Sequence, residues 1–250
     1  MKKILLILAM FALGATAASA QKVRVMSYNV HNCGGIDGIK SIDRCADVIR
    51  EASADVIAIQ EVDSMTRRNK KYMLGELAER TGYTPYFGQT IPYRGGGYGI
   101  GVLTKKPAQS VEFRRLPCRK EPRGMLVVDM GKYYFIATHL SLVKEDQLTS
   151  VEIIRDVVSK LNKPVFFAGD LNARPNSATM AAFRKFMVVL NDSNKATFPA
   201  DAPRHCIDYI LGANGSFKVA KDYVFYDNLA SDHLPLYVDV KIAKPKKSKK

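Results

Sequence analysis

The sequence predicts an α/β fold with mixed sheets, formed by one large domain. Short apolar runs with strand-like alternation are interspersed with amphipathic segments that have helical spacing. The last strand candidates follow one another closely with no helix between them, which a purely parallel βαβ array would not allow. We find no internal repeat and no convincing linker before Lys241, so residues 21–243 are expected to fold as one domain.

The first half of the chain alternates between strand and helix patterns. Residues 22–30 alternate as in a strand, and residues 41–53 have helical spacing with a serine at the N-cap position. Residues 55–62 form the nearly continuous apolar run of a buried strand, and a second helix over 71–82 is ended by a glycine. Residues 94–107 are predicted to be a glycine-rich loop that enters a strand.

The rest of the chain has the same two kinds of pattern. Strands are predicted at about 110–114, 125–130, 133–139, 164–171, 206–212, 216–226 and 234–242. Helices are predicted at 145–162, which is amphipathic, and at 177–187.

The first twenty residues have the organisation of a secretory signal peptide. A Lys-Lys head precedes an apolar stretch, which ends in the small residues Ala-Ser-Ala. The alternative is an N-terminal membrane anchor, but the apolar run is short for a span and no cysteine follows it to take a lipid. We therefore expect cleavage before Gln21 and an exported protein, periplasmic or extracellular, without stable insertion in the membrane.

The chain is strongly basic, with a formal net charge of +14. Two lysines lie in residues 1–20 and six in residues 241–250, which leaves about +6 for residues 21–240. The lysine-rich tail, 244–250, is expected to be a solvated end, and the sharper alternative is an arm that binds polyanions. The modestly basic body favours an anionic substrate.

Four cysteines, Cys33, Cys45, Cys118 and Cys206, allow three full disulfide pairings, between which the sequence does not choose. Cys45 falls on the apolar face of the predicted helix 41–53, which favours a buried free thiol. The sequence has no CxxC pair, so a structural zinc site is not expected.

Polar residues stand at the ends of several apolar strand patterns. They are Asn29 and His31, Gln60, Glu61 and Asp63, His139, Asp170 and Asn172, Asp208, and Asp232 with His233. Any single one could cap a turn or balance an ion pair, but several buried carboxylates are costly unless they are paired or bind a cation. The set is rich in oxygen and lacks cysteine, which suits Mg²⁺, Mn²⁺ or Ca²⁺ better than zinc. The chemistry of such a site is hydrolysis of a phosphoryl group.

The ordered motifs SYNV, IQEV, GIGVLT, THL, GDLNARP, IDYIL and SDHLPL resemble the endonuclease/exonuclease/phosphatase superfamily, over about Val23 to Val240. The resemblance implies the deoxyribonuclease-I-like fold, a four-layer α/β sandwich of two packed sheets flanked by helices. It also implies an enzyme that hydrolyses phosphoesters with Mg²⁺ or Mn²⁺.

Family roles for the metal and the attacking water follow from the same resemblance. Glu61 is implied as the principal metal ligand, with Asn29 and Asp232 beside the same ion. His233 would act as the general base or position the water, and Asp208 would hold its imidazole as in hydrolytic triads.

The resemblance also assigns the groups that would contact the substrate phosphate. Asp170 would orient the nucleophile or bind a second metal, Asn172 would donate to the phosphoryl oxygens, and His139 would bind the scissile phosphate. Some nuclease members carry a catalytic tyrosine in the loop before Gly124, where this chain has LPCRKEPRG. Arg119 or Arg123 could supply charge there instead, which would favour a general phosphodiesterase.

Two further positions concern the substrate. Arg94, with Tyr93 and Tyr98, is hypothesised to line the substrate groove on the glycine-rich loop, and the alternative is a mobile loop with buried tyrosines. A basic residue often precedes the IDYI motif in the family, and this chain has His205-Cys206 at that place.

Three functions remain open from the sequence. The first is an exported, Mg²⁺-dependent phosphodiesterase or nuclease, a monomer whose partner is a phosphoester substrate such as nucleic acid. The second is a phosphatase or phospholipase-type enzyme acting on phosphomonoesters, inositol phosphates or lipid headgroups, although the absence of Trp excludes a Trp-bearing membrane hairpin. The third is a non-catalytic polyanion-binding protein.

Overall fold

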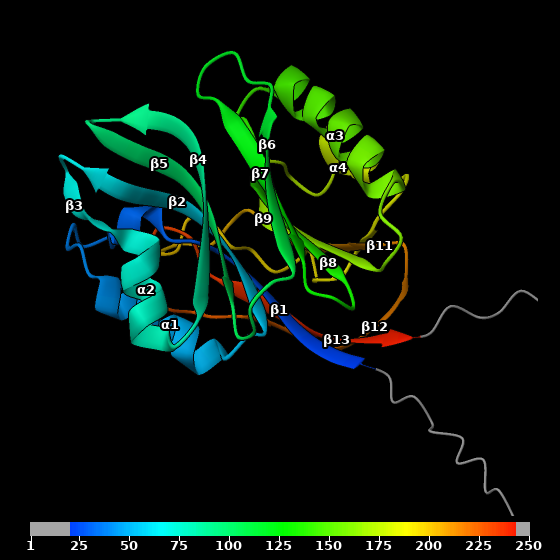
Figure 1. Cartoon of the computed structure of the whole chain (residues 1–250), viewed down its shortest axis with the longest axis horizontal. Helices are drawn as coiled ribbons and strands as arrows, with labels where there is room; N and C mark the ends of the chain where they lie inside the picture. Colours follow the sequence, from blue (N-terminus) through cyan, green and yellow to red (C-terminus); the bar gives the residue numbers. More distant parts are fainter. Residues whose placement is uncertain (1–20, 244–250) are drawn as a thin grey trace, which may run out of the picture.

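The structure, a computed structural model, describes residues 21–243 and consists of two β-sheets packed face to face with helices on their outer faces (Figure 1). This is the four-layer α/β sandwich that the resemblance implied. The predicted signal peptide, 1–20, and the lysine-rich tail, 244–250, lie outside the described residues. Within residues 21–243, no helix is both long enough and apolar enough to cross a bilayer.

The first sheet has seven strands and contains the N-terminal strand near its centre. Its order is β12 (Ser216–Val224), β13 (Leu236–Ala243), β1 (Gln21–Asn29), β2 (Val56–Thr66), β5 (Gly96–Thr104) and β4 (Thr84–Tyr93), with β3 (Asn69–Tyr72) paired to β2. The pair β1–β2 is parallel and is connected by α1 (Ile42–Ala52), while the other pairs are antiparallel. A second helix, α2 (Met73–Thr81), lies beside α1.

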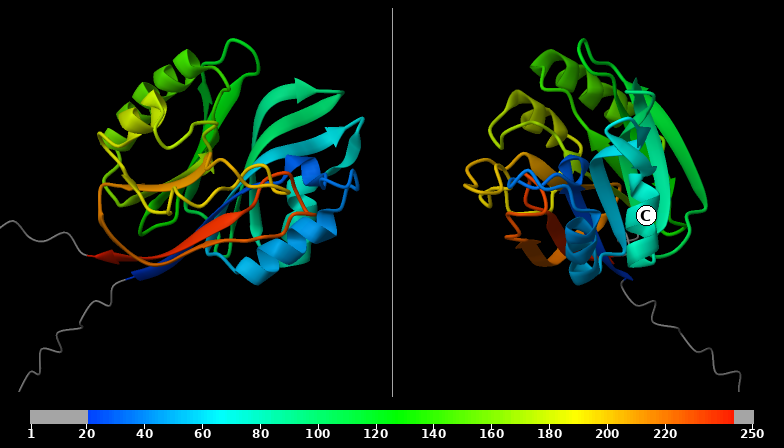
Figure 2. Two further views of the ribbon diagram at one scale, coloured as in Figure 1. Left: turned by 180° about the vertical axis from the view of Figure 1, so that it is seen from behind. Right: turned by 90° about the vertical axis from the view of Figure 1, so that its left-hand side faces the viewer.

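The second sheet has six strands and repeats this plan. Its order is β10 (Val188–Val189), β11 (Asp208–Ala213), β9 (Val165–Asp170), β8 (Tyr134–His139), β7 (Arg123–Asp129) and β6 (Ser110–Leu116). Here the parallel pair is β8–β9, connected by α3 (Lys144–Ser159), and α4 (Ala178–Phe183) packs beside α3. The helices of the two sheets lie on opposite sides of the molecule (Figure 2).

Central strands are buried on both faces, which explains their nearly continuous apolar runs. In β2, Val56 and Ala58 join the core between the sheets, while the intervening Ile57 and Ile59 pack in the cluster under α1 and α2. Strand β9 has the same alternation, because Phe166 belongs to the inter-sheet core and its neighbours face the cluster under α3 and α4. Three apolar layers therefore hold four layers of secondary structure together.

Local signals set the ends of the first two helices as the sequence predicted. Ser41 accepts a hydrogen bond from the Arg44 amide at 3.2 Å, which caps α1, and Gly82 ends α2 with φ of +74°. Cys45 is a buried free thiol on α1, as expected, and lies 3.6 Å from the hydroxyl of Tyr28. The other three cysteines are also free.

The prediction for 94–107 is confirmed for the strand, β5, but wrong for the length of the glycine-rich loop before it, because β5 begins at Gly96 and forms a β-hairpin with β4. The turn is only two residues long, Arg94 and Gly95, both with positive φ, as the twist of a tight hairpin requires. The following glycines lie inside β5 because the chain is crowded there: a Cβ on Gly99 would lie 2.1 Å from the carbonyl oxygen of Gly88. Strands β3, β4 and β10 were not expected from the sequence.

Candidate active site

The two parallel strand pairs bring their carboxyl ends to the same rim. Asn29 ends β1 and Glu61 lies on β2, whereas His139 and Asp170 end β8 and β9 in the other sheet. The amide Nδ2 of Asn29 donates to Glu61 Oε1 and to Asp170 Oδ2, each at 3.1 Å. One buried side chain thus connects the polar residues of both sheets.

Strand register aligns three of the predicted residues in one row across the second sheet. Asp208 on β11 pairs with Asp170 on β9, and Asp170 pairs with His139 on β8. Directly opposed residues point to the same face of a sheet, so their three buried side chains lie together. The sequence pattern indicates each of these residues separately, and the register of β11, β9 and β8 explains why their side chains meet in one site.

Glu61 reaches the rim through an irregularity of its strand. The register of β2 with β5 shifts between Gln60 and Val62, which places Glu61 in a β-bulge with φ of +61°. This left-handed conformation is costly for a residue other than glycine and is often retained at functional sites. The bulge directs the half-exposed Glu61 carboxylate away from the regular alternation of β2.

His233 is fixed by three contacts. Its Nδ1 lies 2.9 Å from Asp208 Oδ2, and Thr197 Oγ1 donates to the same carboxylate oxygen at 2.6 Å. The ring of Phe198 lies 4.7 Å from the imidazole, centroid to centroid. The other ring nitrogen, Nε2, faces Asp170 Oδ2 at 3.7 Å. The hydrogen bond to Asp208 therefore leaves Nε2 directed at Asp170.

The cluster around His233 contains several carboxylates and few cationic groups, and this imbalance shifts the pKa values of its members. Burial lowers the pKa of His233, but Asp208, Asp170 and Asp232 outweigh it and raise the pKa to about 10. Burial and the charge of Asp208 raise the pKa of Asp170 to about 7, although His233 opposes the shift. Oδ1 of Asp208 is buried and has no hydrogen-bond partner in the part of the chain that the structure describes. The cluster thus has an excess of negative charge that a cation would relieve.

A second group of side chains lies on the other side of Asp170. His139 Nε2 is 3.4 Å from Asp170 Oδ2 and 3.1 Å from Asn172 Nδ2, and Arg123 lies 3.5 Å from His139 Nδ1. The pKa of His139 lies well below its usual value, so this imidazole is neutral. Burial is the main cause, and the charges of Arg123 and His233 add to it. Arg123 is buried, and its Nε has no partner among the described residues. Arg119 is directed elsewhere, since it pairs with Asp146.

Asp232 lies at the edge of the cluster, half-buried, before β13. Burial raises its pKa, and the nearby charge of Glu61 adds to this effect against His233 and His31. His31 Nδ1 is 3.6 Å from Asp232 Oδ1. The sequence placed His31 with Asn29 at the end of one strand. In the structure β1 ends at Asn29, and His31 begins the short 3₁₀ helix η1 (His31–Cys33) instead. Glu61 thus adds to the negative charge that acts on Asp232.

The structure brings together most residues that the sequence singled out, but Arg94 and His205 lie apart. Arg94 is exposed at the β4–β5 turn, with its guanidinium 5.4 Å from the Tyr93 ring, and its substrate-binding role stays a prediction. His205 Nε2 contacts Arg174 at 3.2 Å. Thr197 was missed, because a threonine in a loop carries no signal until its contact with Asp208 is seen.

Two parts of an oxygen-rich site fit a divalent cation. Glu61, Asn29 and Asp232 form the set that the resemblance implied, although Asn29 Oδ1 in this structure accepts from the His31 amide. Separately, Asp170, Asp208 and His233 offer ligand atoms that all lie within 4.8 Å of one another. In that second set, a cation would compete with the short Asp208–His233 hydrogen bond. We therefore favour the first set, which the resemblance implies, because neither Glu61 nor Asp232 makes such a short bond to a histidine among the described residues and the charge of Glu61 acts on Asp232.

Comparison with known proteins agrees with this geometry. The sequence profile of the Endonuclease/Exonuclease/phosphatase family matches residues 26–233. No curated protein matches the sequence.

Solved structures with the same fold are numerous, and three illustrate their range. An endonuclease/exonuclease/phosphatase from Beutenbergia cavernae has a TM-score of 0.76 at 24% identity, covering 89% of this chain and 72% of its own. A mannosyl-6-phosphatase from Bacteroides thetaiotaomicron has a TM-score of 0.69 at 18% identity, covering 87% and 99%. The human Nocturnin catalytic domain with bound sulfate has a TM-score of 0.68 at 16% identity, covering 89% and 95%.

At these identities the neighbours establish the fold, and the profile match over most of the chain establishes the family. The motifs singled out Asp208, Asp170, His139, His233 and Glu61, and the structure places the first three in one row with His233 bonded to Asp208, while their catalytic roles stay predictions. The chain belongs to the Endonuclease/Exonuclease/phosphatase family, a family of hydrolytic phosphoesterases.

Proposed function

We propose that the protein is a divalent-metal-dependent phosphodiesterase, with nucleic acid as the leading substrate class and Mg²⁺ or Mn²⁺ as the metal. The observation that carries the proposal is the orientation of His233, whose Nδ1 is held by Asp208 and whose Nε2 faces Asp170. A base oriented by a buried carboxylate, facing a second carboxylate, is the arrangement needed to activate a water molecule.

The residues that would hold the metal are Glu61 and Asp232, with Asn29 beside them. When bound, a divalent cation would polarise the phosphoryl oxygens and offset the charge that develops on them. The Asn29 amide donates to both Glu61 and Asp170, so it holds the two carboxylates in a fixed position relative to each other.

The chain's own groups would divide the remaining work. A water that contacts both His233 Nε2 and Asp170 Oδ2 would be oriented for attack. In the metal-free protein the pKa of His233 is raised to about 10, so Nε2 carries a proton and Asp170 Oδ2 is the acceptor. A bound cation would offset the negative charge that raises this pKa, which would free His233 to take the proton, and Asp208 would then stabilise the imidazolium.

The buried Arg123, beside His139, would donate to the phosphoryl oxygens through its Nε, which has no partner among the described residues. The amide of Asn172 is bonded to His139 Nε2 and to the Leu140 carbonyl, and it would exchange one of these partners for a phosphoryl oxygen.

Removal of the metal is expected to abolish hydrolysis. Plasmid DNA, RNA and bis(p-nitrophenyl) phosphate should each be incubated with the protein in Mg²⁺, in Mn²⁺ and in EDTA, beside an Asp170→Asn variant. We expect cleavage that EDTA stops, that added metal restores, and that the variant lacks. Equal rates with EDTA would contradict metal dependence, and turnover of none of the three would contradict the phosphodiesterase proposal.

Metal binding has a second readout that does not depend on turnover. A ligand that binds only the folded state at 100 times its Kd stabilises that state by about 2.7 kcal/mol. Mg²⁺ should therefore raise the Tm of the wild type, and Glu61→Gln should lose most of this increase. Glu112→Gln is the matched control, because Glu112 is an exposed partner of Arg114 on β6. An equal increase in Tm for Glu61→Gln and Glu112→Gln would show that Glu61 is not a ligand of the metal.

A phosphomonoesterase is the second candidate function. One structural neighbour is described as a mannosyl-6-phosphatase, and the groups around Asp170 would accept a terminal phosphate as well as a bridging one. Sugar phosphates and inositol phosphates should be added to the assay, with release of inorganic phosphate as the measurement. Turnover of these compounds alone would favour this second function.

We also propose that the protein is exported, because residues 1–20 have the organisation of a signal peptide. Protein isolated from its host should begin at Gln21 by N-terminal mass spectrometry. A chain that retains Met1 would contradict the proposal.

A further inference from the structure

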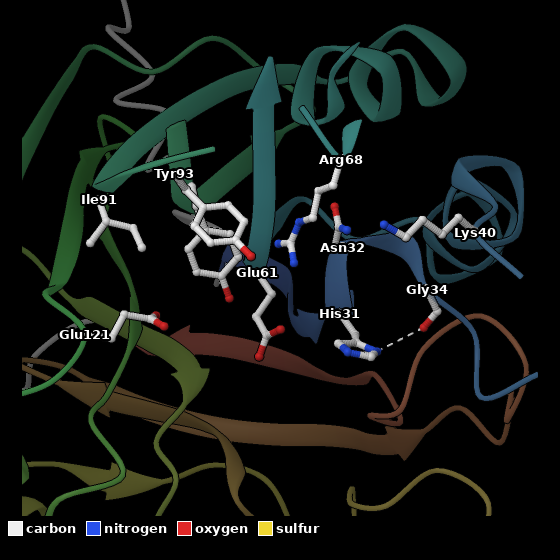
Figure 3. A pocket seen from close by; sticks show the side chains of 10 residues that line it. His31, Asn32, Gly34, Lys40, Glu61, Arg68, Ile91, Tyr93 and Glu121 are labelled. Atoms are coloured by element: carbon white, nitrogen blue, oxygen red, sulfur yellow. Dashed lines mark hydrogen bonds between the residues drawn. The ribbon is translucent and has the colours of Figure 1, made fainter. Parts of the chain in front are cut away.

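A pocket of about 250 Å³ opens beside the candidate active site and shares Glu61 with it (Figure 3). Its walls come from the segment around η1, from the end of β2 and the residues after it, and from the β4–β5 hairpin. The lining residues are His31, Asn32, Gly34, Lys40, Glu61, Arg68, Ile91, Tyr93, Tyr98 and Glu121. Pockets for drug-sized ligands usually exceed about 300 Å³, so this one has room for a single chemical group next to the site.

Arg68 is held rigidly at the wall of this pocket by a fully buried carboxylate. Its Nε and Nη2 donate to the two oxygens of Asp63 at 2.7 and 2.8 Å, a bidentate pair. Thr66 Oγ1 also donates to Asp63, at 2.8 Å. The guanidinium carbon lies 4.6 Å from the centre of the Tyr93 ring and 5.6 Å from that of Tyr98. Asp63 and the two tyrosines therefore fix both the position and the plane of the guanidinium.

This arrangement leaves unused donors in the pocket. A guanidinium has five N–H donors, and Asp63 accepts one from Nε and one from Nη2, which leaves three donors, two of them on Nη1. Asn32, in the amide orientation that satisfies its neighbours, donates to Asp63 at 3.0 Å and accepts from Lys40 Nζ at 2.9 Å. Lys40 is thereby drawn toward the same wall and keeps two ammonium protons free. The buried carboxylate thus organises two cationic side chains.

The charge balance of the pocket favours an anion. Arg68 is balanced by Asp63, and Glu121 on the opposite wall is paired with Arg123. Lys40 forms no ion pair within residues 21–243, and Glu61 would be neutralised by the metal proposed above. Rigid guanidinium donors next to an ammonium group match the charge and the several acceptor oxygens of a phosphate.

We propose that this pocket binds a second phosphate group of the substrate, carried within one monomer unit of the phosphate that is hydrolysed. The inference rests on the proposed function, because it takes the scissile phosphate to lie at Glu61 and Asp170. This second phosphate could come from either of two kinds of substrate: it is the neighbouring phosphate of a polynucleotide, or the second phosphate of a small bisphosphorylated metabolite. Asp63 is then a positioning residue and Arg68 a binding residue.

The first test measures binding without turnover. Thymidine 3′,5′-bisphosphate and thymidine 5′-monophosphate should be titrated calorimetrically into the full chain with Ca²⁺ present. We expect the bisphosphate to bind at least about tenfold more tightly, the worth of one hydrogen bond to a charged group. Arg68→Ala and Lys40→Ala should each reduce this ratio, and Arg67→Ala should retain it. Arg67 is the matched control because it is exposed, adjacent and identically charged, and it does not line the pocket.

Arg68→Ala leaves the Asp63 carboxylate buried without its cation, so this variant could fail to fold. Lys40→Ala keeps the proposal testable, because Lys40 is exposed. Arg68→Lys is the second safeguard: it keeps the charge opposite Asp63 but loses the bidentate fork, and it should lower the ratio of the two affinities.

The second test separates this inference from the proposed function. The p-nitrophenyl ester of thymidine 5′-phosphate should be compared with the same ester carrying a 3′-phosphate. We expect the added phosphate to lower KM about tenfold with little change in kcat, and only in proteins that retain Arg68 and Lys40. Equal affinity for both nucleotides in the wild type, or an unchanged affinity ratio in Lys40→Ala and Arg68→Lys, would contradict phosphate binding in the pocket. Preferential binding of the bisphosphate without any hydrolysis would support the pocket and contradict the proposed phosphodiesterase activity.

Competition assays distinguish the two sources of the second phosphate. A short single-stranded oligonucleotide and fructose 1,6-bisphosphate should each be tested as inhibitors of bis(p-nitrophenyl) phosphate hydrolysis. Stronger inhibition by the oligonucleotide in the wild type than in Lys40→Ala would support the polynucleotide, and the reverse preference would support a small metabolite. Inhibition by either compound that is unaffected by Lys40→Ala would count against the pocket.

Discussion

Replacing His233 with alanine is expected to lower kcat by about 10²–10⁴-fold, the usual contribution of a positioned general acid–base group. The physical reason is geometric, because His233 Nε2 faces Asp170 at 3.7 Å and the methyl group of alanine reaches neither a water nor the carboxylate. The measurement is the steady-state rate with the substrate that the wild type turns over, at saturating metal. His205→Ala is the matched control, since His205 contacts Arg174.

A loss of similar size in His205→Ala would show that histidine removal in this region damages the fold rather than the chemistry. Circular dichroism and Tm should therefore accompany both variants. If His233→Ala retained more than about a tenth of the wild-type kcat, general base catalysis by His233 would be excluded.

Asp208→Asn is expected to produce a loss of comparable size, up to about 10⁴-fold in kcat, with a much smaller change in KM. Asparagine has almost the same shape, but it cannot stabilise an imidazolium and it can donate to Nδ1 rather than accept from it. Asp208 is a positioning residue that acts through His233, at 2.9 Å. A purely structural role would instead lower the Tm and the amount of active protein, leaving the kcat of the folded fraction unchanged.

The double variant His233→Ala/Asp208→Asn sharpens this test. If Asp208 acts only through His233, the double variant should be no slower than His233→Ala alone, since groups that act as a unit are non-additive. Losses that multiply would show that Asp208 has a separate role, for example as a ligand of the metal within the Asp170–Asp208–His233 set.

The sequence singled out residues that the structure brings together, because these residues interrupt otherwise apolar strands; their roles in catalysis stay predictions. An aspartate that ends VFFAGD, or one that begins DYILGA, has no structural partner in its own strand, and both are buried in the structure. Their mutual placement follows from strand register, which sequence patterns do not specify across non-consecutive strands. For that reason Asp170, Asp208 and His139 were identified, while the row that they form was not.

The parts that the sequence did not predict depend on contacts between distant segments. Strand β4 contains Pro85 and Pro92 and lacks apolar alternation, because it lies at the edge of the first sheet, where proline is tolerated. Arg68 looks like one of several surface cations in TRRNKK, and its importance depends on the buried Asp63 five residues earlier. Thr197 likewise gains its role only through the fold.

Neither sheet contains all the residues of the candidate active site. Asn29, Glu61 and His233 belong to the first sheet or to the segment that leads into it, whereas Asp170 and Asp208 belong to the second. The bonds from Asn29 to Asp170 and from His233 to Asp208 therefore cross the seam between two separately hydrogen-bonded sheets. Sliding of one sheet over the other by a fraction of an ångström would change both distances together. The apolar side chains between the sheets, far from any substrate, consequently set the alignment on which turnover depends.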